Sequence, residues 1–229
     1  MSVEIGTPFG SEMYDVGINP THVQALVDDS SKIIRVDQES RFKFEDFLVG
    51  RDLIAELRDE YGVNVPRFDY ILGWDPDRQV RAVYTVVDRV DGVEIWSLNQ
   101  FRQAELPPVH KQFDLLCANL ARYYCDKYGN DAPFFTDWHR GDFIYGRAPG
   151  DEEDKVYLVD IDPRFSRQEP KQETKESDRY LIRRHVHKIY SLVEEMERLL
   201  GNLRFEDARQ ELSRFGGYID LPTYFIIKP

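Results

Sequence analysis

The sequence predicts an α+β fold in two parts: a small antiparallel sheet with one helix, followed by a mostly helical part. Residues 1–91 contain short strand-like segments around a single helical stretch. Residues 92–229 contain longer stretches in which apolar residues recur at intervals of three and four. Apolar residues make up 41% of the 229-residue chain and aromatic residues 13%. That content is enough to build a core, and it excludes a disordered chain.

Five strands are predicted around the helix of the first part. Apolar residues fall near helical spacing between residues 44 and 61, and Gly62 is a stop signal for that helix. The turn Asp28–Ser31 joins the second strand to the third, and the polar stretch 88–92 is the predicted hinge to the second part. The strand-like segments are 12–17, 22–28, 32–36, 67–72 and 80–88.

Three helices and one strand pair are predicted in the second part. The first helix follows Pro107 and ends near Gly129, the second ends at Gly201, and the last spans 204–215. His185 and His187 lie off the apolar stripe of the second helix, so both are predicted on a solvated face. The strands are 143–145 and 156–159, and the acidic run 150–154 between them is predicted as an exposed hairpin tip.

Charge and cysteine content exclude several classes of protein. The chain has 30 Lys and Arg against 42 Asp and Glu, a net charge of −12, and no basic cluster that would neutralise a phosphate backbone, so no nucleic-acid partner is expected. No apolar run reaches the roughly 20 residues that cross a bilayer, so a cytoplasmic protein without a membrane partner is expected. Cys117 and Cys125 share a predicted helix about 12 Å apart, too far for a disulfide, which predicts reduced thiols.

Carboxylates near the strand pair indicate chemistry. Asp142 ends the loop segment 136–142 (TDWHRGD), and Asp160 follows the apolar strand 156–159. A hairpin would bring the two carboxylates together, and Mg²⁺ favours such oxygen ligands together with phosphate oxygens and water. Asp137 would then accept or orient a hydroxyl that attacks a phosphoryl group.

These motifs resemble the protein-kinase-like superfamily, and most closely its aminoglycoside and small-molecule phosphotransferase branch. That branch carries H-G-D-x-H-x-x-N and then, after two strands, I-D-[WFI]-[DE]. Asp137, His139 and Asp142 match the D-x-H-x-x-N frame, and residues 158–162 (LVDID) match the second motif. The resemblance implies a two-lobed fold with a reduced helical lobe, and a phosphotransferase that moves the γ-phosphoryl group of ATP to a hydroxyl of a small molecule or protein.

The same resemblance assigns roles to residues. Asp137 becomes the catalytic residue, Asp142 and Asp160 the Mg²⁺ ligands, and His139 and Asp162 supporting residues of the loop and metal site. Gly17 lies in the segment that corresponds to the family's phosphate-covering turn. The Asp88 carbonyl and the Val90 amide become the groups that bind adenine.

The sequence also departs from the family. The third-strand Lys that reaches the phosphates aligns with Arg35, because Lys32 emerges on the opposite face of the strand. The resemblance implies a helix partner for Arg35, with Glu45 favoured and Glu56 as the alternative. Asp142 replaces the family's metal-binding Asn, the leading His is missing, and Gly17 stands where the protein-kinase pattern has three glycines. Two alternatives therefore stay open: a pseudokinase or nucleotide-binding scaffold without turnover, and a metal-dependent hydrolase.

Overall fold

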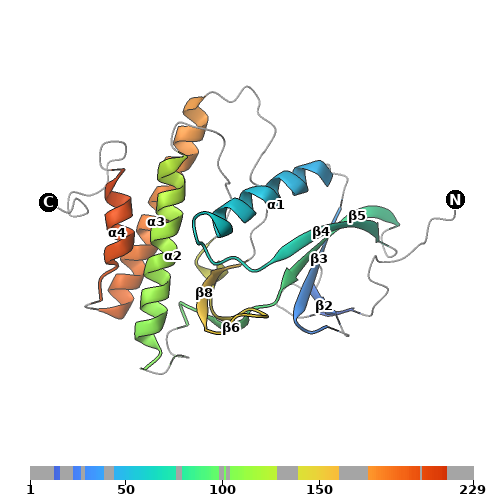
Figure 1. The fold of residues 1–229 in the computed structure, drawn as a ribbon, viewed down its shortest axis with the longest axis horizontal. Coiled ribbons are helices and arrows are strands. Elements are labelled where there is room, and N and C mark those ends of the chain that lie inside the picture. Colours follow the sequence, from blue (N-terminus) through green and yellow to red (C-terminus); the bar gives the residue numbers. More distant parts are fainter. Residues whose placement is uncertain are drawn as a thin grey trace.

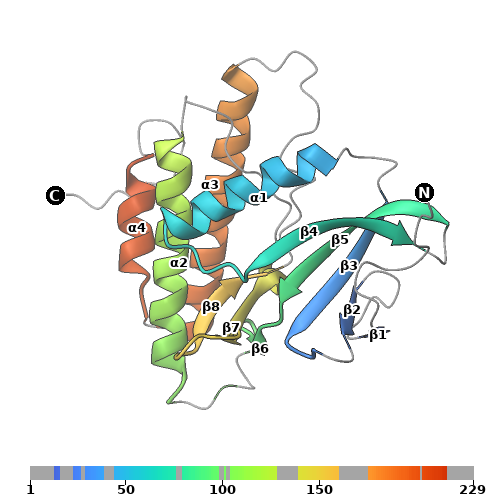
Figure 2. The same ribbon diagram turned by 45° about the vertical axis from the view of Figure 1, so that its right-hand side comes forward.

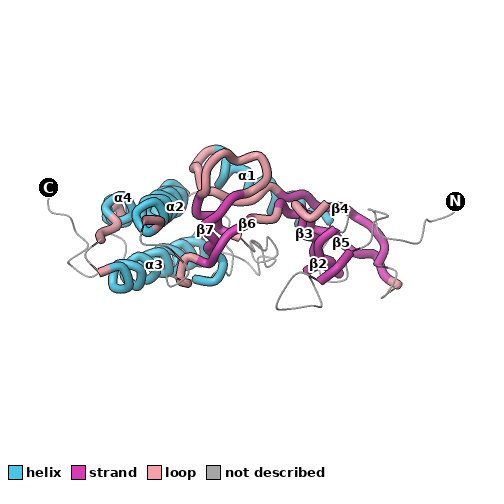
Figure 3. The backbone as a smooth tube through the Cα atoms, turned by 90° about the horizontal axis from the view of Figure 1, so that it is seen from below, coloured by secondary structure: helices cyan, strands magenta, loops and turns pink. Residues whose placement is uncertain are grey.

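A computed structural model describes residues 13–15, 23–26, 29–38, 44–75, 79–97, 101, 104–127, 139–159, 175–201 and 203–215. The three later helices gather at one end of the molecule and a twisted sheet forms the other end, with a smaller sheet between them (Figure 1). Figure 3, from below, shows the same sequence of helices, small sheet and large sheet along the long axis. The predicted mixture of helices and antiparallel strands is confirmed.

The larger sheet is antiparallel throughout, in the order β1-β2-β3-β5-β4. Its strands are β1 (Met13–Asp15), β2 (Val23–Leu26), β3 (Lys32–Gln38), β4 (Phe68–Asp75) and β5 (Val80–Asp88). The register pairs Arg35 with Thr85 and Ile33 with Val87. Because side chains alternate along a strand, these four lie on one face, while Ile34 and Tyr84 pack on the other.

Helix α1 (Phe44–Asp59) crosses this sheet. Its Phe47 packs edge-on against Tyr70 of β4, with 5.1 Å between ring centroids, and beside Val83 of β5. The other end of α1 reaches the second part of the molecule (Figure 2). There Ile54 and Leu57 join the core formed by the later helices, whereas the larger sheet carries two smaller clusters of its own.

The smaller sheet consists of β6 (Asp91–Glu94), β7 (Phe143–Arg147) and β8 (Lys155–Leu158), in the order β6-β7-β8. The predicted hinge 88–92 therefore overlaps a strand that the sequence did not reveal. Gly92 pairs with Gly146, and a Cβ atom on Gly92 would lie 2.3 Å from the Tyr145 carbonyl oxygen. The close pairing of these two strands thus needs glycine at this position.

The helical part contains α2 (Leu106–Asp126), α3 (Lys175–Leu200) and α4 (Glu206–Ser213). Pro107 and Pro108 lie in the first turn of α2, where proline removes no helical hydrogen bond. Asp114 of α2 is buried and accepts hydrogen bonds from the amides of Asp207 (3.2 Å) and Ala208 (2.8 Å), so it caps α4 from a neighbouring helix. The apolar residues that recur at helical spacing on α2 and α3 are buried, and only Leu200 among them is half-buried. The buried ones are Val109, Phe113, Leu116, Leu120 and Tyr124 on α2, and Ile182, Val186, Ile189, Val193 and Met196 on α3.

The prediction for His185 is wrong, whereas His187 is exposed as predicted. His185 is buried, and its ring lies 5.1 Å from that of Tyr124 on α2. It borders the apolar stripe, and α2 covers more of α3 than that stripe alone. Both Cys117 and Cys125 are free thiols. Within the described ranges, no helix has the length and apolarity to cross a bilayer.

Candidate functional site

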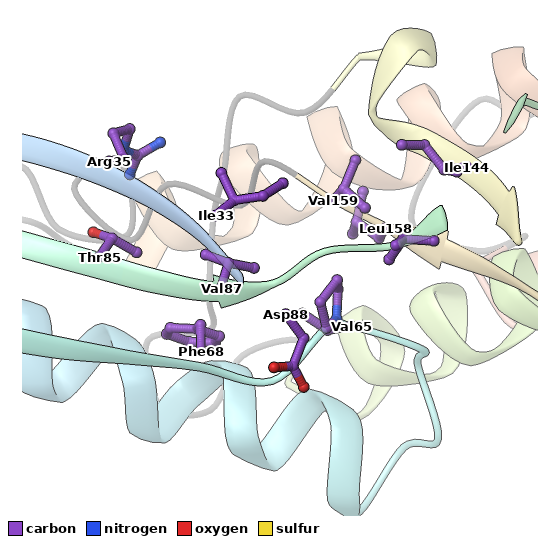
Figure 4. Close-up of a pocket in the computed structure, with 12 residues that line it drawn as sticks. Ile33, Arg35, Val65, Phe68, Thr85, Val87, Asp88, Ile144, Leu158 and Val159 are labelled. Carbon is purple, nitrogen blue, oxygen red and sulfur yellow. The ribbon is translucent and has the colours of Figure 1, made fainter. Parts of the chain in front are cut away.

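A pocket of about 230 Å³ lies where the larger sheet meets the β7–β8 hairpin. Figure 4 shows its walls, with Ile33 and Val87 from the larger sheet and Ile144 and Leu158 from the smaller one. Phe68 at the start of β4 adds a further apolar surface. Most of the lining is apolar, and the polar groups are confined to two regions.

Arg35 and Thr85 form the first polar region, at one side of the pocket (Figure 4). They are register partners on β3 and β5, and Thr85 is buried. Arg35 was predicted from the sequence, but Thr85 was not. The signal for Thr85 was the strand alternation, which places 33, 35, 85 and 87 on one face once the two strands are paired. A guanidinium at this position offers a planar set of donors that suits a phosphate group.

The helix partner of Arg35 stays a prediction. Glu45 is exposed on α1. Glu56, the alternative, pairs with Lys127 at the end of α2. That ion pair connects α1 to the helical part of the molecule.

The second polar region is the segment that leaves β5, where Asp88 and Val90 line the pocket. The Asp88 amide donates to the Arg67 carbonyl (2.8 Å), and the Arg89 amide donates to the Ser31 carbonyl (2.7 Å). The Asp88 carboxylate forms an ion pair with Lys32. This segment is therefore held by β3 on one side and by the start of β4 on the other.

The turn before β7 carries His139 and Asp142. Residues Arg140–Asp142 form a short 3₁₀ turn in which the His139 amide donates to Asp142 Oδ2 (2.6 Å) and the Gly141 amide donates to His139 Nδ1 (3.1 Å). The Asp142 side chain is buried while His139 is exposed. Asp142 thus shapes the turn through its carboxylate, and Arg140 ties the turn to Glu195 of α3 (2.9 Å).

The hairpin brings the chain back beside Asp142. Phe143 pairs with Leu158, and the Val159 amide donates to the Asp142 carbonyl (2.7 Å). Asp160 is the next residue along the chain. The predicted residues Gly17, Asp137, Asp160 and Asp162 themselves lie outside the described residues. Within the described residues, no three His, Cys, Asp or Glu side chains group as a metal site.

The far end of the hairpin is structural. Gly150 adopts a left-handed φ of 88° at the predicted tip, and Asp151 accepts hydrogen bonds from Lys155 (2.8 Å) and the Tyr157 hydroxyl. Burial raises the pKa of Tyr157, and the hydrogen bond to Asp151 raises it further. The Tyr157 hydroxyl thus ties β8 to the turn of the hairpin.

Comparison with known proteins gives little sequence similarity. No protein-family model matches the chain, and no curated protein sequence matches it. Among solved structures, one described as WaaP in complex with acyl carrier protein matches with 16% identity over 96% of this chain and 90% of that chain. Its TM-score is 0.46.

Proposed function

We propose that this protein is a kinase-like phosphotransferase, which moves the γ-phosphoryl group of ATP to a hydroxyl of a small molecule or protein. One observation carries the proposal: sequence elements more than a hundred residues apart meet at one pocket. The pocket is lined by Arg35, by Asp88 and Val90, and by Ile144 and Val159 near the 139–142 turn. The family resemblance places Arg35, Asp88 and Val90 in a nucleotide site, and Val159 adjoins Asp160, a predicted metal ligand.

The pocket suits the base of a nucleotide. Its volume of about 230 Å³ is below the roughly 300–1,000 Å³ of pockets that enclose whole small-molecule ligands, so it would hold the base while the phosphates extend beyond it. The apolar walls would sandwich the ring. The Asp88 carbonyl and Val90 amide would bind its edge, and Arg35 would bind the phosphates, with Gly17 predicted to help cover them.

The residues near β7 and β8 would hold Mg²⁺. A carboxylate offers about four lone-pair positions, so Asp142 can accept the His139 amide and still bind a cation. The hydrogen bond between Val159 and Asp142 brings the chain to within one residue of Asp160, the second proposed ligand. His139 and Asp162 would support this site from outside the metal's ligands. When bound, Mg²⁺ supplies charge neutralisation and orientation of the phosphate groups.

The remaining chemistry is positioning. Asp137 would accept a hydrogen bond from the acceptor hydroxyl and align its oxygen with the phosphoryl group. Phosphoryl transfer requires little covalent participation from the protein, so one such carboxylate with Arg35 and the metal ligands is a sufficient set.

Transfer of radiolabel from γ-labelled ATP to water and to a panel of hydroxyl-bearing acceptors tests the proposal. Wild-type protein with Mg²⁺ should release or transfer label, and Asp160→Ala should abolish this. Glu152→Ala, an exposed change on the same hairpin, should have no effect. Absence of both turnover and nucleotide binding in the wild type would contradict the proposal.

A scaffold that binds nucleotide without turnover is the second candidate. Arg35 in place of Lys and the single Gly17 favour it, as does the use of the Asp142 carboxylate to cap its own turn. It predicts thermal stabilisation by nucleotide with no release of label. A metal-dependent hydrolase predicts instead metal binding without any shift in melting temperature on addition of ATP.

A further inference from the structure

Lys32 and Asp88 face each other across β3 and β5 and form an ion pair. The Asp88 side chain is only 5% exposed, whereas that of Lys32 is 36% exposed. Lys32 lies three positions from Arg35 on the same strand, so the two side chains leave opposite faces of the sheet. Lys32 is therefore directed away from the proposed phosphate region.

Asp88 is the point at which the base-binding segment is attached to the sheet. Its amide donates to the Arg67 carbonyl, next to β4, and its carboxylate binds Lys32 of β3. Figure 4 shows Asp88 beside Val65, apart from Arg35 and Thr85. The ion pair thus acts on the part of the pocket that would hold the base.

We propose that Lys32 is a positioning residue that sets the base-binding edge of the pocket through Asp88; this rests on the proposed nucleotide site. A buried carboxylate that loses its cationic partner bears a large desolvation cost, so it moves toward water when it can. Such a movement of Asp88 displaces its own carbonyl and the nearby Val90 amide. Lys32 therefore supports binding of the base without touching the nucleotide.

Calorimetric titration of the full chain with three ligands tests this: Mg²⁺·ATP, adenosine and inorganic tripolyphosphate. Lys32→Met should weaken the binding of ATP and of adenosine by the same factor of about ten. This factor corresponds to the loss of one hydrogen bond of about 1.4 kcal/mol. Tripolyphosphate binding should be unchanged. Arg35→Met should show the reverse pattern, with weaker ATP and tripolyphosphate and unchanged adenosine.

Two further variants separate a positioning role of Lys32 from general destabilisation. The double variant Lys32→Met with Asp88→Asn removes both charges and should restore adenosine binding. Lys32→Arg keeps the positive charge and should retain adenosine binding. Lys111→Met, on an exposed face of α2, is the control for loss of one positive charge. Folding of each variant is checked by its melting temperature.

Three results would overturn the inference. If Lys32→Met loses stability while its folded fraction binds adenosine as the wild type does, the ion pair is merely structural. If Lys32→Met weakens tripolyphosphate binding as much as adenosine binding, Lys32 acts at the phosphates. Failure of the double variant to recover adenosine binding would remove Asp88 from the argument. If the wild type binds neither ATP nor adenosine, the proposed function itself fails, and that outcome is distinct from the other three.

Discussion

Replacing Asp114 by Ala should destabilise the helical part measurably. Asp114 of α2 is buried and provides the acceptors for the first amides of α4, whose own N-cap residue, Phe205, makes no side-chain hydrogen bond. Two hydrogen bonds to a charged group are worth about 3–6 kcal/mol in total. Burial raises the pKa of Asp114 despite those bonds, so the carboxylate bears a desolvation cost that the variant removes. We therefore expect a net loss of about 2–3 kcal/mol.

The loss corresponds to a decrease in melting temperature of roughly 4–12 °C for a chain of this size. Urea unfolding followed by circular dichroism measures it directly. Asp114→Asn keeps one acceptor oxygen and should fall between the wild type and Asp114→Ala. Glu206→Ala, exposed in the first turn of α4, serves as the control, and an equal loss in that variant would refute the capping argument.

Three further predictions concern ion pairs and the proposed metal site. Burial opposes the charge of Glu197, but hydrogen bonds from Arg209 and from a backbone amide outweigh it and lower its pKa. Its stabilisation should be complete above the ordinary value of 4.5 and be lost as the pH falls through the lowered pKa, and Glu197→Gln should remove this dependence from pH-series unfolding curves. Lys127→Met, which breaks the partly buried pair with Glu56, should cost about 1–2 kcal/mol in urea unfolding. Asp142→Asn should retain Mg²⁺-dependent nucleotide binding in titrations, whereas Asp142→Ala should weaken the affinity for Mg²⁺ by at least about 10–100-fold. An equal loss of Mg²⁺ affinity in both variants would argue against Asp142 as a metal ligand.

Local patterns predicted most of the elements. The helices were visible because their apolar residues recur at helical spacing, and β3 to β5 because of strand-forming residues between turn signals. Strand β6 was missed because its pairing with β7 joins residues about fifty positions apart, and nothing in Asp91–Glu94 alone indicates a partner. The burial of His185 was missed for a similar reason, since it depends on Tyr124 of another helix.

In the candidate site, too, some residues could be predicted from the sequence, whereas others depend on contacts between distant segments. Arg35, Asp88 and Val90 were predicted through the resemblance to the kinase-like superfamily, and the structure brings them to one pocket. Thr85, Ile144 and the Lys32–Asp88 pair depend on register and on contacts between sheets, which single segments do not encode. The roles of Asp137 and Asp160 stay predictions.

The connection after α1 has a consequence for dividing the chain. The Gly62 carbonyl accepts a hydrogen bond from Asn119 of α2 (3.0 Å), and the Asn64 carbonyl accepts one from the Leu158 amide (2.9 Å). Val63 and Val65 are buried in the same core. A fragment truncated near residue 91 would keep these groups but lose their hydrogen-bond donors on α2 and β8 and the later part of the core. The sequence suggests two parts, but the first part depends on the second for its fold. Expression of the first part alone should therefore yield a polypeptide that aggregates.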